Sequence, residues 1–166
     1  MRGGITRYVG VEATSKGFCF AVIEDTERLL DWGGREVKGS TGIFINKLGG
    51  VIDRYRVDVL VLEDPAGSRK GKTVKGWLSW AEEYAHKRKI KPVAVSKEAF
   101  QAFTSSYGST KGETARRLAR LFPELEGLVP PPRKTWESER RRMGIFVALE
   151  RALLVAHGRQ DKPAGK

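Results

Sequence analysis

The sequence predicts an α/β domain in which helices cover both faces of a mixed, five-stranded β-sheet. Two observations predict this fold. Three apolar segments joined by short turns come first, as in an antiparallel meander, and apolar strands then alternate with segments of helical periodicity. At 166 residues the chain has the length of one ordinary domain. We therefore expect residues 1–158 to form a single domain, followed by a disordered polar tail over residues 159–166.

Three strands open the chain. Their segments are short, rich in apolar residues and separated by turn residues, and they cover residues 8–12, 17–24 and 29–37. In the first strand, alternation places Tyr8, Gly10 and Glu12 on one face and the two valines between them on the other. Gly33-Gly34 indicates a bulge or bend in the third strand. The chain therefore begins as a three-stranded meander.

Helices and strands alternate in the remainder of the chain. Apolar residues at helical spacing predict helices over residues 40–55, 73–88 and 98–103, one that begins at Thr110, and one over residues 135–157 that Gly158 ends. Two further strands are predicted over residues 57–62 and 91–95. A helix followed by a buried strand implies a crossover to a parallel neighbour. The prolines at 130–132 predict a stiff connector before the last helix.

The composition indicates a polyanionic partner. The formal net charge is +11 and the isoelectric point is about 10.0, which attracts phosphate backbones. The alternative is a basic protein that its charge keeps soluble. No apolar run approaches the ~20 residues that a membrane span needs, and the N-terminal residues lack the apolar core of a signal peptide. We therefore expect a cytoplasmic protein without a membrane partner.

Carboxylates follow two of the predicted strands. The buried segment VDVLVLEDP, residues 57–65, ends in Glu63 and Asp64, and Glu12 ends the first strand. If these strands are parallel neighbours, Glu12 and Glu63 come within reach of one another. Two carboxylates at such a short distance repel each other unless a cation lies between them. Oxygen ligands favour Mg²⁺ or Mn²⁺ as that cation. The alternative for Glu63 and Asp64 is that they only begin a turn before Pro65.

A third acidic group lies in the first turn of the last helix. It consists of Glu137 and Glu139, and three arginines follow at once. Acids at a helix start also complement the helix dipole, which explains them without a function. The two histidines are expected on exposed helix faces, and the single cysteine, Cys19, is expected to pack as a buried apolar residue.

These segments resemble a known family. The meander that begins GVEATSKGFCFAVIE, the strand VLVLEDP and a last helix that begins with acids are similar to the RNase H-like fold and, within it, to the RuvC-like Holliday-junction resolvases. The resemblance implies that Glu12 takes the place of the family's usual aspartate and that Glu63 is the strand-four glutamate. It implies a further carboxylate at Glu139, with Glu137 as the competing choice. Lys111 resembles a lysine near the active site of such proteins, or it is a solvated helix lysine.

The resemblance implies a metal-dependent, structure-selective DNA endonuclease that hydrolyses phosphodiester bonds in branched DNA. Two Mg²⁺ or Mn²⁺ ions about 4 Å apart would share Glu12. The catalytic residues would be Glu12, Glu63, Glu139 and Lys111, and the metal ligands Glu12, Glu63, Glu137 and Glu139. A branched substrate favours a homodimer. Phosphates would contact Lys16, Arg69, Lys70, Lys72, Arg116, Arg133, Lys134, Arg140 and Arg141.

Two alternatives stay open. One is a nuclease of the same fold that acts on structured RNA. The other is a non-catalytic nucleic-acid-binding module, which is favoured by the longer side chain of Glu12 and by Arg142 and Met143 one turn after Glu139, where the family carries a second acid. An arginine lodged between Glu12 and Glu63 would favour this last alternative. Trp32, Trp80 and Trp136 are candidates for stacking on bases, whereas Trp77 is expected in the core.

Overall fold

Five strands form one mixed sheet in the order β3-β2-β1-β4-β5. The architecture comes from a computed structural model, which describes residues 4–129 and 136–160, with the side chains of the last helix described for residues 142–158. The strands are β1 (Arg7–Thr14), β2 (Gly17–Glu24), β3 (Arg28–Glu36), β4 (Val59–Glu63) and β5 (Lys91–Val95). The helices are α1 (Thr41–Tyr55), α2 (Lys72–Lys87), α3 (Lys97–Thr104), α4 (Lys111–Leu121) and α5 (Trp136–Gln160), with short 3₁₀ turns η1 (Pro65–Gly67) and η2 (Pro123–Leu128).

The pairing of the strands confirms the predicted topology. Strands β1, β2 and β3 pair antiparallel, whereas β4 pairs parallel to β1 and β5 pairs parallel to β4. The carboxyl ends of β1 and β4 therefore lie at the same edge of the sheet. A bulge is one of the two features predicted at Gly33-Gly34, and it is absent there, because the two glycines pair regularly with Phe20 and Cys19. The register shifts instead opposite Val22 and Ile23, where Leu30 is the extra residue of β3.

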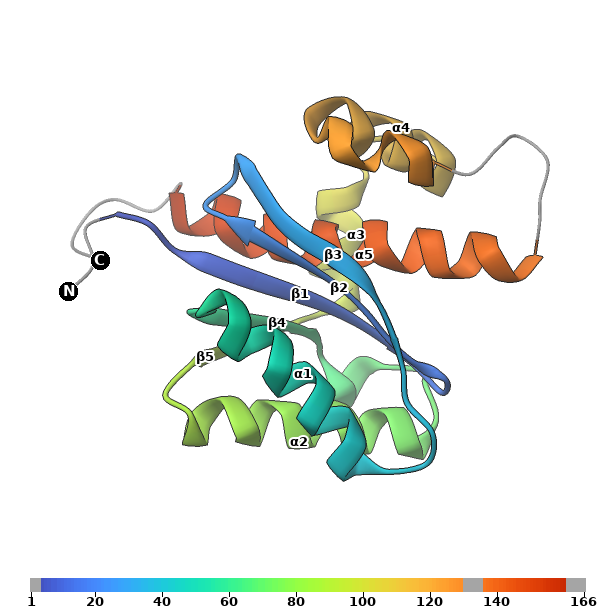
Figure 1. Cartoon of the computed structure of the whole chain (residues 1–166). Helices are drawn as coiled ribbons and strands as arrows, with labels where there is room; N and C mark the ends of the chain where they lie inside the picture. Colours follow the sequence, from blue (N-terminus) through green and yellow to red (C-terminus); the bar gives the residue numbers. More distant parts are fainter. Residues whose placement is uncertain (1–3, 130–135, 161–166) are drawn as a thin grey trace.

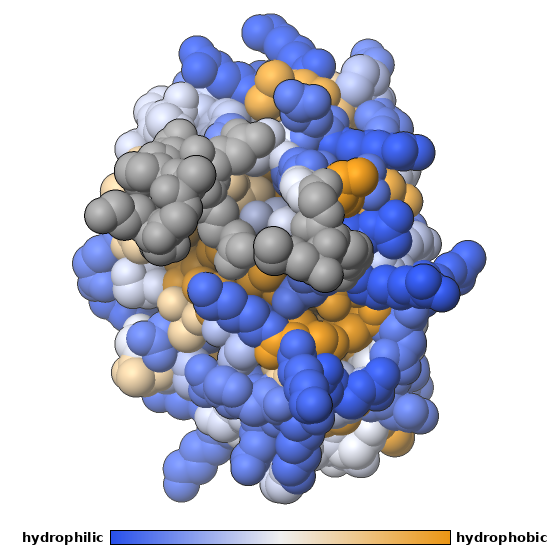
Figure 2. Space-filling view, turned by 90° about the vertical axis from the view of Figure 1, so that its left-hand side faces the viewer, coloured by the Kyte–Doolittle hydropathy of each residue, from blue (hydrophilic) through white to orange (hydrophobic). Residues whose placement is uncertain are grey.

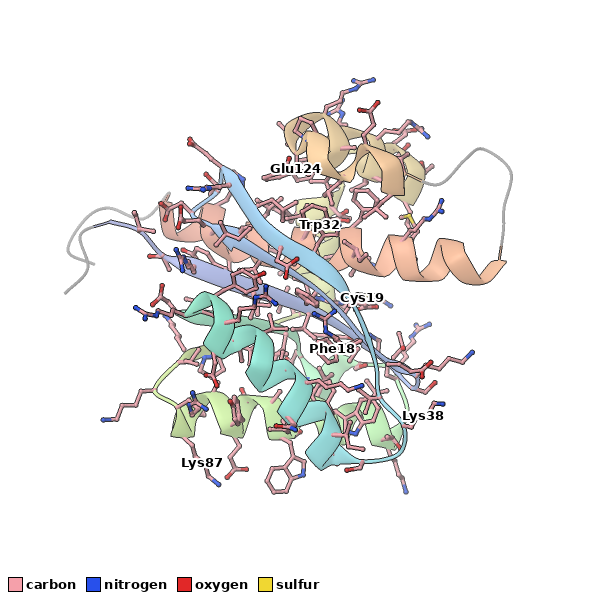
Figure 3. The ribbon with its side chains drawn as sticks, viewed as in Figure 1. Phe18, Cys19, Trp32, Lys38, Lys87 and Glu124 are labelled. Atoms are coloured by element: carbon pink, nitrogen blue, oxygen red, sulfur yellow. The ribbon has the colours of Figure 1, made fainter. Side chains whose placement is uncertain are left out.

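Two apolar clusters hold the layers together. Helices α1 and α2 cover one face of the sheet, and α5 covers the other with α3 and α4 above it (Figure 1). Phe18 and Cys19 are neighbours in β2, yet Phe18 belongs to the cluster under α1 and α2 and Cys19 to the cluster under α5 (Figure 3). This alternation is the period of two expected of a strand that is buried on both faces. The predicted core positions of α5, among them Phe146, Leu149 and Leu153, are buried.

Gly10 allows α5 to approach β1 closely. A Cβ atom built on Gly10 would lie 1.9 Å from the carbonyl oxygen of Ala148, which is backbone and cannot turn away. Only glycine therefore permits this contact between helix and strand. Tyr8, Gly10 and Glu12 share one face of β1, as the alternation of the sequence predicts, and this is the face that α5 covers. The contact at Gly10 consequently positions the next residue on this face, Glu12, beside Gly144 in the preceding turn of the helix.

The ends of α5 and the connectors differ in part from expectation. The helix continues through Gly158 to Gln160 and does not stop at Gly158. The glycine does not adopt the positive φ that a helix stop of this type requires. Helices α1 and α4 begin where the sequence predicts, and Ser40 and Thr110 cap them, with their hydroxyl groups accepting from the backbone N–H groups of Ile43 and Glu113. The prolines at 130–132 and most of the predicted polar tail lie outside the described residues.

Among the described residues, no helix combines the length and the apolar character that crossing a bilayer requires. Figure 2 shows the end of the molecule that lies opposite the carboxyl ends of β1 and β4. There, hydrophilic side chains surround a smaller apolar area.

Candidate functional site at the carboxyl ends of β1 and β4

Glu12 and Glu63 converge, as the parallel pairing of β1 and β4 predicts. The ammonium group of Lys70 bridges them: its Nζ lies 3.1 Å from Oε1 of Glu12 and 2.8 Å from Oε1 of Glu63. The side chains of the two glutamates are 19% and 20% exposed, respectively. The site is therefore a partly buried pair of carboxylates, and it faces the last helix.

Arg151 of α5 also contacts both carboxylates. Its guanidinium donates to the backbone carbonyl of Val11 at 2.8 Å and to Oε1 of Glu12, and it lies 3.8 Å from Oε1 of Glu63. The guanidinium also stands over the ring of Phe100, 5.2 Å from the centroid. Only 8% of the Arg151 side chain is exposed. Arg151 is therefore held in place from several sides, and the close approach of α5 at Gly10 brings it there.

Lys70 reaches the site from the loop after β4. Asp64 begins this loop by accepting from the backbone N–H of Ala66, so Asp64 has the turn role that was its alternative interpretation. The buried hydroxyl of Ser68 accepts from the backbone N–H of Lys70, and Lys70 Nζ donates to the carbonyl of Ala13 at 2.7 Å. Lys70, predicted to contact phosphate, is thus turned inward to the acids and is 25% exposed.

The charges around Glu63 keep it ionised. Burial on its own raises the pKa of Glu63, but the hydrogen bond and the charge of Lys70 outweigh it. The charge of Arg151 and the hydroxyl of Ser68 act in the same direction, so the pKa of Glu63 lies below its ordinary value. Glu63 is consequently a carboxylate at neutral pH, and it faces the cationic side chains of Lys70 and Arg151.

A third acid, Glu150, lies next to Arg151 on α5 and is buried. It is 4% exposed, and Thr104 donates its hydroxyl proton to the carboxylate. Burial raises the pKa of Glu150 to about 7, although the Thr104 hydrogen bond and the charges of Arg151 and Lys111 oppose this shift. Lys111 therefore lowers the pKa of Glu150 through its charge. Lys111 forms no ion pair with Glu12 or Glu63 among those of the described residues.

The predicted acids of the last helix lie in its first turns. Glu137 and Glu139 belong to α5, but their side chains are outside the described part of the chain. The α5 residue beside Glu12 is Gly144, where an added Cβ would lie 4.0 Å from Cγ of Glu12 and 2.7 Å from Sγ of Cys19. Glu139 precedes Gly144 by five residues, which is about 7.5 Å of helix rise. The last helix therefore presents a glycine and an arginine to Glu12.

Apart from Lys70, which contacts the acids, the predicted phosphate contacts divide into three groups. Lys16, in the turn between β1 and β2, and Arg69 and Lys72, in the loop and at the start of α2, are exposed at the same sheet edge as the acids. Arg116 is exposed on α4. The remaining residues, Arg133, Lys134, Arg140 and Arg141, lie outside the described residues or have side chains that are outside them.

The aromatic residues follow the predicted division only in part. Trp77 is buried and stacks on Phe44 with ring centroids 4.9 Å apart, so it belongs to the core as expected. Trp80 is 52% exposed on α2, and Trp32 is half-buried and packs against the cluster under α5. The side chain of Trp136 is outside the described residues.

The donors that the structure describes, Glu12 and Glu63, do not fit the pair of divalent ions that the resemblance implies. Within the described part of the chain, no group of three or more acidic, histidine or cysteine side chains is arranged to hold a metal ion. Glu12 and Glu63 already contact two cationic side chains, so the formal charges of these four described residues balance. A divalent ion 4 Å from the Arg151 guanidinium would be repelled by about 8 kcal/mol at an effective dielectric constant of 20, twice the value for unit charges.

Sequence reasoning missed Arg151 and Glu150. A signal was present, because both residues stand in the apolar second half of α5, between the buried Leu149 and Ala152. Charged residues in an apolar helix stripe are rarely buried without partners. What the pattern does not show is which partners they meet, since these come from β1 and from α3.

Comparison with solved structures shows the RNase H-like fold of the RuvC resolvases. The chain is similar to RuvC of Thermus thermophilus, with a TM-score of 0.62, 15% identity and coverage of 95% of this chain and 98% of that one. It is also similar to T. thermophilus RuvC in complex with a Holliday junction substrate, with a TM-score of 0.63, 20% identity and coverage of 93% and 96%. The resolvase of fowlpox virus in complex with a substrate Holliday junction gives a TM-score of 0.57 at 12% identity over 92% and 98%.

Comparison with other sequences adds one relative. The chain is 30% identical over 149 residues to the mitochondrial atypical kinase COQ8B of Rattus norvegicus, a match that covers 87% of this chain and 26% of that protein. The chain thus spans about a quarter of that protein's length. It contains neither the H-R-D nor the D-F-G motif of protein kinases. No family model matches the sequence.

Proposed function

We propose that this protein binds branched DNA without hydrolysing it, through the surface around the carboxyl ends of β1 and β4. One observation carries the proposal: in a resolvase fold, the two converging acids Glu12 and Glu63 are paired with Lys70 and Arg151. Two proteins of similar fold are described in complex with Holliday junctions, which supports branched DNA as the ligand. Binding then depends on the basic surface and needs no bound metal ion.

The charge distribution supports a phosphate-binding role for this edge. The chain carries a net charge of +11, and Lys16, Arg69 and Lys72 are exposed beside the neutralised acids. Because Glu12 and Glu63 are paired, they repel a nearby phosphate less than free carboxylates would. Contacts to phosphate position a protein on nucleic acid without reading sequence, which suits recognition of a branch by its shape.

An electrophoretic mobility-shift assay tests this proposal. We expect tighter binding to a four-way junction than to a linear duplex of the same length or to a structured RNA. Replacing Lys16, Arg69 and Lys72 together by glutamine should weaken junction binding and lower the slope of log K against log salt by about 3. The matched control replaces three other lysines by glutamine. These are exposed at the opposite edge of the sheet: Lys87, Lys89 and Lys91. Equal affinity for junction and duplex, or equal effects of both triple variants, would contradict the proposal.

Hydrolysis of phosphodiester bonds is the second candidate, and the convergence of Glu12 and Glu63 favours it. In this case Mg²⁺ or Mn²⁺ would have to replace the contacts that Lys70 and Arg151 make. A nicking assay on a labelled four-way junction with either metal distinguishes the two candidates. Nicking by the wild-type protein that is lost in Glu12→Gln and Glu63→Gln would establish the second candidate. No nicking alongside tight junction binding would support the first.

We also propose that the chain acts as a single domain and as a homodimer. A four-way junction has approximate two-fold symmetry, so two copies of one site match it better than one. Light scattering coupled to size-exclusion chromatography should give twice the mass of the chain. If the measured mass were that of one chain both with and without junction DNA, the proposed homodimer would be refuted.

A further inference from the structure

Arg151 brings a permanent positive charge to the site. A guanidinium group does not lose its proton in proteins, so its charge cannot be removed by a shift of pKa. The geometry also restrains Arg151, because its Nη1 donates to both the Val11 carbonyl and Glu12, and its guanidinium stands over the Phe100 ring. Only 8% of the side chain is exposed, so moving its charge into solvent would break these contacts.

Lys70 contacts the same two carboxylate oxygens as Arg151, Oε1 of Glu12 and Oε1 of Glu63. Its ammonium group contacts Glu12, Glu63 and the carbonyl of Ala13, so it ties the loop after β4 to the ends of both parallel strands. The residues that flank this contact, Arg69 and Lys72, stay exposed. The inward lysine consequently fixes the part of the loop that carries the outward basic side chains.

We propose that Arg151 and Lys70 are built-in counter-ions that take the place of metal ions at Glu12 and Glu63. The two acids then act as positioning residues: they hold α5 and the loop after β4 against the sheet edge and do not act as metal ligands. This inference deepens the proposed function and rests on it only where DNA is concerned. Its consequence for DNA is that junction binding is the same in a chelator as in Mg²⁺.

A manganese titration of the DNA-free protein tests whether Arg151 and Lys70 take the place of metal ions. We expect no saturable Mn²⁺ binding by the wild-type protein in electron paramagnetic resonance, and a melting temperature unchanged by about 1 mM Mn²⁺. The double variant Arg151→Glu/Lys70→Gln places a third acid beside Glu12 and removes both cations. It should acquire a saturable Mn²⁺ site and melt at a higher temperature when Mn²⁺ is added.

A matched control separates this effect from net charge. Arg120→Glu/Lys87→Gln changes the total charge by the same amount at exposed positions, and it should bind no more Mn²⁺ than the wild-type protein. The proposal would be overturned if the wild-type protein bound Mn²⁺ saturably and Glu63→Gln abolished this binding. This measurement does not require the double variant to fold. A double variant that folds and yet gains no Mn²⁺ site would also count against it.

The same samples keep the two proposals distinguishable. If the wild-type protein binds Mn²⁺ and also binds the junction in EDTA, the counter-ion role of Arg151 and Lys70 is refuted, and the proposal of branched-DNA binding stands. If the protein binds no Mn²⁺ and no junction, the proposed function is refuted, whereas the role of Arg151 and Lys70 is supported.

Discussion

Replacing Arg151 by methionine should destabilise the protein by about 3 kcal/mol. The substitution keeps most of the apolar side chain but removes the donor to the buried carbonyl of Val11 and the charge beside Glu12. A buried carbonyl left without a partner costs about 1–3 kcal/mol, and breaking a buried ion pair costs about 3–5 kcal/mol. The pair contribution is smaller here, because Glu12 is 19% exposed and keeps Lys70 at 3.1 Å.

Urea-induced unfolding at pH 7, followed by circular dichroism, measures the difference. For a chain of this size, about 3 kcal/mol corresponds to a fall of about 6–12 °C in melting temperature. Arg120→Met, at an exposed position of α4, is the control and should change stability by no more than about 0.5 kcal/mol. Added salt should diminish the Arg151 effect only slightly, because buried pairs are weakly screened.

A double-mutant cycle with Glu12→Gln completes the test. If Arg151 and Glu12 interact as the structure shows, the coupling free energy should fall between about 0.5 and 3 kcal/mol. Stability of Arg151→Met equal to that of the wild-type protein, or a coupling of zero, would refute the buried pair and with it the account of the site.

Three further predictions concern the remaining architecture. Because the pKa of Glu150 is raised to about 7, the folded protein binds a proton more tightly than the unfolded one, so stability should fall as pH rises from about 4.5 to 7. Glu150→Gln should remove up to about 3 kcal/mol of this pH dependence in unfolding measured at pH 5 and pH 8, and an unchanged slope would contradict it. Gly10→Val should cost at least about 3 kcal/mol or prevent folding, since the added side chain meets the backbone of Ala148, and a fully stable variant would disprove that contact. Calorimetry should show one cooperative transition, because both apolar clusters share the sheet, whereas two separate transitions would indicate two domains.

Local patterns were sufficient to predict most of the fold. The alternation in β1, the apolar run of β4 and the helical spacing in α5 depend on contacts that repeat every two or 3.6 residues, so the sequence displays them directly. The convergence of Glu12 and Glu63 also followed, because parallel neighbours share an edge. The bulge at Leu30 and the continuation of α5 past Gly158 did not follow, since both depend on how the element packs against its neighbours and not on the propensity of one residue.

The sequence by itself determined the layers, the sheet topology, the basic charge and the edge at which two acids meet. Only the tertiary structure decided what those acids contact. Arg151 lies 139 residues from Glu12 in the chain, and no periodicity connects them. Gly10 brings α5 against β1, and the loop after β4 turns Lys70 inward. The physical reason is that the charge balance of a site depends on which side chains packing places within a few ångströms, and distance along the chain does not record this.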